Sequence, residues 1–271
     1  MEQFITPDRL WPAARYAFAL ALAGLGLTGM AFGDFALQWQ PVPEGIPGRT
    51  LLAILTGGGL VILAGGLVLR SSAPFAAIVL MAVMAVWTLL LHLPRVVMNV
   101  PWAWLGFFEF LAIAGAALIL ASALWQGREG ALARFTGPGA AHIGLILFAV
   151  STPFFGLSHL ISVEGAARFV PDWLPFAEFW VVATGIGHAA VGLALLAGIL
   201  TRLATALYTV MVASFVLTVH IPDLISDPAR HQFWVMVFVA LLIFAAVLTL
   251  AAHVWTRRPG LLGRVPAESA S

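Results

Sequence analysis

Long apolar runs, separated by short polar or proline-marked segments, make up almost the whole chain. Eight of these runs are each close to the ~20 residues that an α-helix needs to cross a bilayer. They cover residues 14–32, 51–69, 74–93, 102–125, 140–157, 177–199, 203–220 and 232–255. The runs are continuous and not alternating, and lipid offers the backbone no hydrogen-bond partner, so helices are favoured over strands. The pattern predicts an all-α, polytopic membrane protein with eight transmembrane helices.

The sequence between residues 42 and 94 recurs 128 positions later without a gap. The matched segments are Val42–Pro47 with Val170–Pro175, Thr56–Gly59 with Thr184–Gly187, and Leu91–Pro94 with Val219–Pro222. Upstream, Phe32-Gly33 matches Phe155-Gly156, with five extra residues in the second copy. We interpret the chain as a duplicated membrane module. The predicted modules cover residues 1–126 and 140–258 and form two parallel four-helix bundles, because an even number of spans brings both copies into the membrane from the same side.

Composition supports a lipid environment, since 62% of the residues are hydrophobic and only 9% are charged. A soluble domain would carry about 25% charged residues. The net charge of +1 gives no basic surface for nucleic acid. The chain has no cysteine, which excludes disulfides, thiolate metal sites, iron–sulfur clusters and c-type haem attachment.

Arginine placement predicts the orientation of the spans. One side of the membrane would carry nine arginines: Arg9, Arg15, Arg70, Arg128, Arg134, Arg202, Arg257, Arg258 and Arg264. The other side would carry four: Arg49, Arg95, Arg168 and Arg230. The larger number belongs in the cytoplasm. We therefore expect a multi-pass protein of a bacterial inner (plasma) membrane with both termini cytoplasmic. All tryptophans except Trp87, Trp39 among them, lie near predicted span ends, where the interface favours them.

Glu109 and His188 are the polar residues that stand out inside apolar runs. A carboxylate at mid-span is costly, so Glu109 either carries a proton, binds a small molecule or cross-links helices. His188 follows a glycine-containing segment that permits close helix packing. It either bonds a neighbouring helix or contacts haem, a metal or a quinone. In the repeat, Val237 corresponds to Glu109 and Leu60 corresponds to His188, so any such function would be present in only one half.

Histidines also gather at the expected outer face. His92 and His220 are a repeat-matched pair, each two residues before a proline that is expected to end its helix, and His159 ends the fifth span on the same side. Metal, quinone and docking-partner sites are all compatible with these residues, as are helix-end histidines satisfied by backbone and water. The spacings match no compact metal motif, so we predict no metal site. The favoured site is a small-molecule pocket among Glu109, His159, His188 and His220.

The second outer loop, residues 158–175, allows two interpretations. An apolar stripe beside Glu164 and Arg168 is typical of a short helix that lies in the interface plane. The alternative is an irregular connector. Asp34, at the start of the first outer loop, is expected to cap that loop or to pair with Arg49, without a chemical role.

The second half contains the segments FFGLSHL and VPDWLPFAEFWVVATGIGHAAVGLALLAGILTRLATALYTVMVASFVLTVHIPDL, and the first half contains FGDF, VPEGIP, TGGGLVILAGGLVL and LHLP. This sequence resembles the DoxX-like family of small four-helix membrane proteins. The resemblance covers residues 30–94 and 150–222 well. It implies a link to quinone-dependent oxidoreductases, and it implies roles for the Gly156-to-His159 segment, the glycine-rich part of the sixth span and His220.

The first hypothesis is an integral membrane accessory or quinone-contacting subunit of a bacterial inner-membrane oxidoreductase system. Its cofactor would be a quinone, and its partners would be the lipid bilayer and an oxidoreductase or periplasmic protein. One alternative is a non-catalytic scaffold or assembly factor that docks a periplasmic partner through its outer loops. A further alternative is a small-solute transporter. The sequence leaves open whether the chain is an enzyme.

Overall fold

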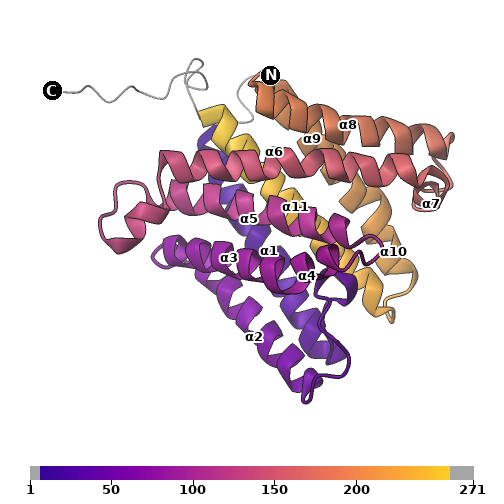
Figure 1. Cartoon of the computed structure of the whole chain (residues 1–271), viewed down its shortest axis with the longest axis horizontal. Coiled ribbons are helices and arrows are strands. Elements are labelled where there is room, and N and C mark those ends of the chain that lie inside the picture. Colours follow the sequence, from indigo (N-terminus) through magenta and orange to yellow (C-terminus); the bar gives the residue numbers. More distant parts are fainter. Residues whose placement is uncertain (1–6, 257–271) are drawn as a thin grey trace.

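The computed structural model describes residues 7–256, which form helices and connecting loops without a strand (Figure 1). The elements of the first half are α1 (Pro7–Phe32), η1 (Leu37–Trp39), α2 (Arg49–Val68), α3 (Ala73–Trp87), η2 (Thr88–His92), α4 (Leu93–Val97) and α5 (Ala103–Trp125). Those of the second half are η3 (Ala131–Phe135), α6 (Pro138–Ile161), α7 (Val163–Ala167), α8 (Ala177–Ala197), α9 (Thr201–Phe215), η4 (Val216–His220), α10 (Ile221–Ser226) and α11 (His231–Thr256).

Eight helical stretches of the described chain are long and apolar enough to cross a membrane, which confirms that part of the prediction. They are Arg9–Phe32, Arg49–Val68, Ala73–Val97, Ala103–Trp125, Ala131–Ile161, Ala177–Ala197, Thr201–Ser226 and His231–Thr256. Each contains most of one predicted apolar run. Three of the arginines used to predict the orientation, Arg257, Arg258 and Arg264, lie outside the described residues.

The expectation that His-x-Pro ends a helix is wrong in both halves. The helix passes through Pro94 and Pro222 by way of a π-helical turn, Thr88–His92 in η2 and Val216–His220 in η4. A proline inside a helix lacks a donor and crowds the carbonyl four residues earlier. A π-helical turn shifts the hydrogen bonding by one residue, and such turns are found mainly as single insertions in α-helices. The two insertions occupy matched positions of the repeat.

Helix packing follows the same pattern in both halves. In the first half α1 packs on α2, α2 on α3, and α3 on α5; in the second, α6 packs on α8, α8 on α9, and α9 on α11. Between the halves, α5 packs on α6 and α1 on α11. These two contacts between halves are as extensive as the largest contacts within either half, so one apolar core runs through all eight helices. The division into two four-helix bundles stays a prediction.

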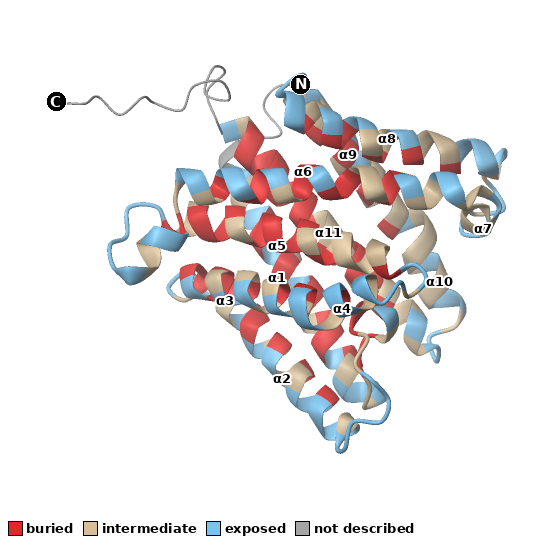
Figure 2. Ribbon diagram, viewed as in Figure 1, coloured by how far each residue is buried: buried red, intermediate tan, exposed pale blue. Residues whose placement is uncertain are grey.

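Burial is greatest at the centre of the helix array (Figure 2). Helices α5 and α11 carry buried side chains along most of their length, and they also contact each other. Helices α2, α3, α8 and α9 lie outside them and expose large apolar side chains, for example Ile62, Phe75, Leu193 and Val210. Exposed apolar surface on this scale is typical of helices that face lipid.

Two close glycine crossings fix the register of the halves. Gly57 on α2 lies against Gly26 on α1, and Gly185 on α8 lies against Gly156 on α6. Because Gly57 and Gly185 are matched by the repeat, Gly156 is the structural counterpart of Gly26. The expected match of Gly156 with Gly33 is therefore wrong. Gly33 instead ends α1 with a positive φ of 62°, a conformation that glycine adopts at little cost.

The Trp39 side chain is buried in the protein, although an interfacial tryptophan was expected to be exposed to lipid head groups. Its ring is 3% exposed and packs against Phe110, with ring centroids 4.4 Å apart, and edge-on against Trp87 at 6.3 Å. The loop of residues 33–48 therefore folds back into the helix core through η1.

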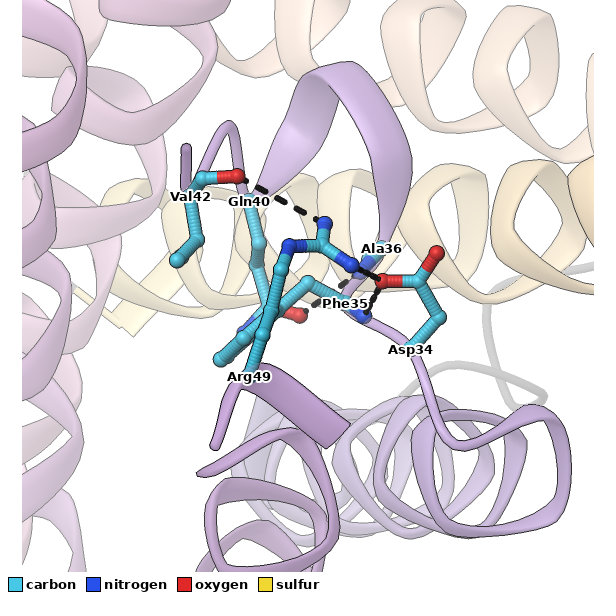
Figure 3. A network of polar contacts seen from close by, with 6 residues as sticks. All are labelled: Asp34, Phe35, Ala36, Gln40, Val42 and Arg49. Carbon is cyan, nitrogen blue, oxygen red and sulfur yellow. Dashed lines mark hydrogen bonds and ion pairs between the residues drawn. The ribbon is translucent and has the colours of Figure 1, made fainter. Parts of the chain in front are cut away.

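The same loop is held by the ion pair between Asp34 and Arg49 (Figure 3). The Asp34 carboxylate also accepts a hydrogen bond of 2.6 Å from the backbone N–H of Phe35. The guanidinium of Arg49 donates a second bond to the carbonyl of Val42 at 3.5 Å. Both expected roles of Asp34, local capping and pairing with Arg49, are confirmed.

Candidate functional site

His188 and Tyr208 form the most buried polar pair of the described spans. The Nδ1 atom of His188 on α8 lies 2.9 Å from the hydroxyl of Tyr208 on α9. His188 is 5% exposed and Tyr208 is 1% exposed. The two rings stand edge to face with centroids 5.3 Å apart. Because both side chains are buried, the polar atoms of this bond have little competition from water.

His159 brings a second imidazole to the same place. It lies near the end of α6, half-buried, with its ring centroid 5.2 Å from that of His188 in an edge-to-face arrangement. Its Nδ1 atom is 3.2 Å from the hydroxyl of Thr184 on α8. Thr184 donates its own hydrogen to the carbonyl of Trp180 at 2.8 Å. The Thr184 oxygen therefore accepts from Nδ1–H of His159.

These partners assign a tautomer to each neutral imidazole. His159 carries its hydrogen on Nδ1, which leaves Nε2 as an acceptor. In the tautomer in which the Tyr208 hydroxyl donates to Nδ1 of His188, Nε2–H of His188 is left as a donor. The pair thus offers one donor and one acceptor, neither of which is hydrogen-bonded to another described residue.

Apolar rings surround the two imidazoles. Phe155 stands edge to face with His188 at 5.7 Å, and Phe215 lies 6.2 Å from His188 and 6.3 Å from His159. Such a lining suits a small aromatic or apolar ligand that carries a few polar atoms.

Along α8, exposure falls toward the pair. Trp180 is 40% exposed, Thr184 is intermediate and His188 is buried. These residues are four positions apart, so they share one face of the helix over about 12 Å. The face leads from the exposed end of α8 to the buried imidazole.

The other two predicted site residues make no contact with this pair. Glu109 on α5 and His220 at the end of η4 are both partly buried. Within residues 7–256, neither forms a hydrogen bond, an ion pair or a ring contact with His159 or His188. The structure therefore brings together two of the four residues, and ligand binding by all four stays a prediction.

His92, the repeat partner of His220, has a packing role. Its Nε2 atom donates to the carbonyl of Trp39 at 3.1 Å, and its ring lies 4.3 Å from that of Phe110. It is 1% exposed. His92 thus secures the loop residue Trp39 to the third span.

The residues of the first half that correspond to His188, Tyr208 and His159 are not polar. In the repeat, Leu60 corresponds to His188 and Leu80 corresponds to Tyr208, and both leucines belong to the apolar core. In the register of the glycine crossings, Gly29 is the residue of the first half that corresponds to His159. The site therefore occurs in the second half alone.

The described chain contains no group of three or more histidine or acidic side chains placed to hold a metal ion.

A cavity of about 250 Å³ lies between α6 and α8 and is lined by His142, Leu145, Leu195 and Gly198, among others. His142 and His159 are 17 residues apart on α6, or about 25 Å. This cavity is therefore separate from the histidine pair.

Tyr208 was missed by the sequence analysis, because a tyrosine in an apolar span is by itself ordinary. The signal that could have found it is the repeat. His188 and Tyr208 both replace leucine at matched positions, and together they change an apolar contact into a hydrogen bond.

Comparisons with known proteins add no relative, since no protein-family model, no curated protein and no solved structure matches this chain.

Proposed function

We propose that the chain is an integral membrane accessory or quinone-contacting subunit of a bacterial inner-membrane oxidoreductase system. In this proposal it is a DoxX-like protein made of two parallel four-helix modules, with both termini in the cytoplasm. The repeated helix packing and the two π-helical turns at matched positions support the duplication. The histidine pair of the second half would supply the quinone contact.

The observation that carries the proposal is the complementary pair formed by His159 and His188. A quinone ring carries carbonyl acceptors, and its reduced form carries hydroxyl donors. Nε2–H of His188 can donate to a carbonyl, and Nε2 of His159 can accept from a hydroxyl. Phe155 and Phe215 give the ring apolar neighbours. These residues fit a quinone head group without a metal or a charged side chain.

The α8 face from Trp180 to His188 supports a lipid-soluble ligand. The polar ring would lie at the histidines, and an apolar tail would remain in the bilayer beside the exposed side chains of α8. The bound quinone supplies the redox chemistry, and the protein residues bind and orient it. Electrons would come from a cofactor of the partner protein.

The experiment is quinone extraction from the purified full-length chain, followed by titration with a soluble short-tail ubiquinone analogue. We expect the wild-type chain to retain quinone and His188→Leu to lose at least about tenfold in affinity, the size of one lost hydrogen bond in an apolar site. His142→Ala, on an exposed residue of α6, is the matched control and should bind normally. Equal retention by wild type and His188→Leu would overturn the proposal.

The second candidate is a scaffold that docks a periplasmic partner. It is favoured by the aromatic side chains between α7 and α8, where Phe169, Trp173 and Phe176 are 60%, 69% and 81% exposed. This loop contains the short helix α7, which spans Val163–Ala167, and its location in the membrane interface plane stays a prediction. A scaffold would lose partner binding when residues 163–176 are replaced by a polar linker, and it would tolerate His188→Leu. Under the quinone proposal, His188→Leu should lose quinone affinity in the titration, and replacement of residues 163–176 should leave that affinity unchanged.

A further inference from the structure

Arg15 is a charged residue within a membrane-spanning helix, and it has almost no exposed surface. It lies on α1 and is 6% exposed. Arginine keeps its charge in proteins and has five N–H donors. In the structure one of these bonds the hydroxyl of Tyr16 at 2.9 Å, while the buried Nε has no partner. None of the acidic side chains in residues 7–256 forms an ion pair with Arg15. Among the described residues, the buried positive charge therefore has no counter-charge.

Packing does not account for this charge. The glycine crossings place Gly156 opposite Gly26, and the same register places Leu145 of α6 opposite Arg15. Leu145 is 5% exposed, so an uncharged side chain fills the matched position of the second half. A buried charge in a bilayer is costly, and such residues are usually paired or bind a ligand. The first half thus keeps an expensive group that the fold does not require.

The position of Arg15 suits a ligand at the membrane surface. It is six residues from Arg9, where the apolar stretch begins, which is about 9 Å along the helix. Helical side chains point back toward the helix N-terminus, and long basic side chains extend toward the interface. The guanidinium lies 4.8 Å from the ring centroid of Tyr16, which is 47% exposed. The charged end of Arg15 is thus beside an exposed residue near the end of the apolar stretch.

We propose that Arg15, together with the Tyr16 hydroxyl, binds a phosphate oxyanion, as carried by the head group of an anionic phospholipid. A phosphodiester presents two oxygens that match the fork of a guanidinium. Basic sites between transmembrane helices bind anionic head groups in this way. The site is independent of the histidine pair and is found only in the first half.

The test measures thermal unfolding of the full-length chain in detergent with added phosphatidylglycerol, phosphatidylcholine or inorganic phosphate. We expect phosphatidylglycerol to raise the Tm of the wild type and phosphatidylcholine to leave it unchanged. Arg15→Gln should lose this rise, with an affinity for phosphatidylglycerol lower by on the order of tenfold. Arg9→Gln, on an exposed arginine of the same helix, is the matched control and should keep it.

Each of the other outcomes also supports or overturns the proposed oxyanion site. An equal rise with inorganic phosphate would support the oxyanion site and assign it to a free anion. An identical rise in wild type and Arg15→Gln would overturn the proposal. If Arg15→Gln does not fold, Arg15→Lys and native mass spectrometry of the wild type replace it. The proposal then requires phosphatidylglycerol to remain bound to the wild type and to be lost more readily from the lysine variant. Equal retention by these two proteins would reject it.

Discussion

The side chains of His188 and Tyr208 connect α8 to α9 through a buried hydrogen bond of 2.9 Å. Each residue replaces a leucine of the first half, Leu60 and Leu80, so the two changes form one structural unit. At the matched positions of the first half, two apolar leucines pack in the core, so this helix contact can also be made without a hydrogen bond.

Removing one member of this pair should be costly, and removing both should be cheap. His188→Leu or Tyr208→Phe alone leaves a buried polar atom unpaired, and we expect each to lower the free energy of unfolding by about 1–3 kcal/mol. The double variant His188→Leu/Tyr208→Phe removes both polar groups. Its loss should be clearly smaller than the sum of the two single losses. Thermal or denaturant unfolding in detergent measures all four proteins.

Additive losses in this cycle would show that the two side chains contribute independently. The hydrogen bond would then not be the unit that distinguishes the halves, and the tautomer assigned to His188 would lose its basis.

The ion pair of Asp34 with Arg49 should contribute more than the pair of Asp227 with Arg230. The first pair is partly shielded, with side-chain exposures of 36% and 22%, and it shares hydrogen bonds with the backbone of the loop (Figure 3). The second pair is 3.6 Å long and more exposed, at 46% and 57%. Asp34→Ala should cost about 1–3 kcal/mol, and Asp227→Ala should cost at most about 1 kcal/mol. Unfolding measurements on both variants provide the comparison.

Proteolysis gives a second measure of the same difference. Asp34→Ala should expose residues 33–48 to a protease that leaves the Asp227→Ala protein intact. If both variants are cleaved and unfold alike, the network around Arg49 adds nothing beyond an ordinary surface pair.

The sequence predicted the spans and the repeat more fully than the site. Apolar runs identify transmembrane helices because the bilayer sets their length, and the eight helices follow from that constraint. The path through Pro94 and Pro222 was not predictable, because a proline near the end of an apolar run usually ends a helix, and the π-helical turns that precede both prolines leave no pattern in the sequence. His159 and His188 were both identified as candidates, but their contact depends on the crossing of α6 with α8. Glu109 attracted attention by its chemistry alone, which carries no information on which helix face it occupies.

The glycines of α2 should differ sharply in their tolerance of alanine. A methyl group on Gly57 would meet the backbone of Gly26, whereas one on Gly58 or Gly59 would meet open space. Gly57→Ala should therefore cost about 1–3 kcal/mol through overpacking. Gly58→Ala should be neutral or stabilising by up to about 1 kcal/mol, since alanine is the better helix former. Gly156→Ala should behave like Gly57→Ala, because its added methyl group would meet the backbone carbonyl of Gly185 at the matched crossing.

Unfolding measurements on these variants also test the register of the repeat. A tolerant Gly156 beside a sensitive Gly57 would mean that the two crossings are not equivalent, and the assignment of Gly26 as the counterpart of Gly156 would fail.

Substitution of the matched histidines His92 and His220 should have different effects on the free energy of unfolding. His92→Leu removes the donor to the Trp39 carbonyl in a side chain that is 1% exposed, and we expect a loss of about 1–3 kcal/mol. His220 is only partly buried and makes no hydrogen bond to a described residue, so His220→Leu should change stability by less than about 0.5 kcal/mol. Unfolding in detergent measures stability, and Trp39 fluorescence should shift only in the His92 variant, after correction with a Trp39→Phe background. A large loss in the His220 variant would show that the two histidines kept a shared packing role after the duplication. In that case, the fold itself would account for the His220 imidazole without a ligand role.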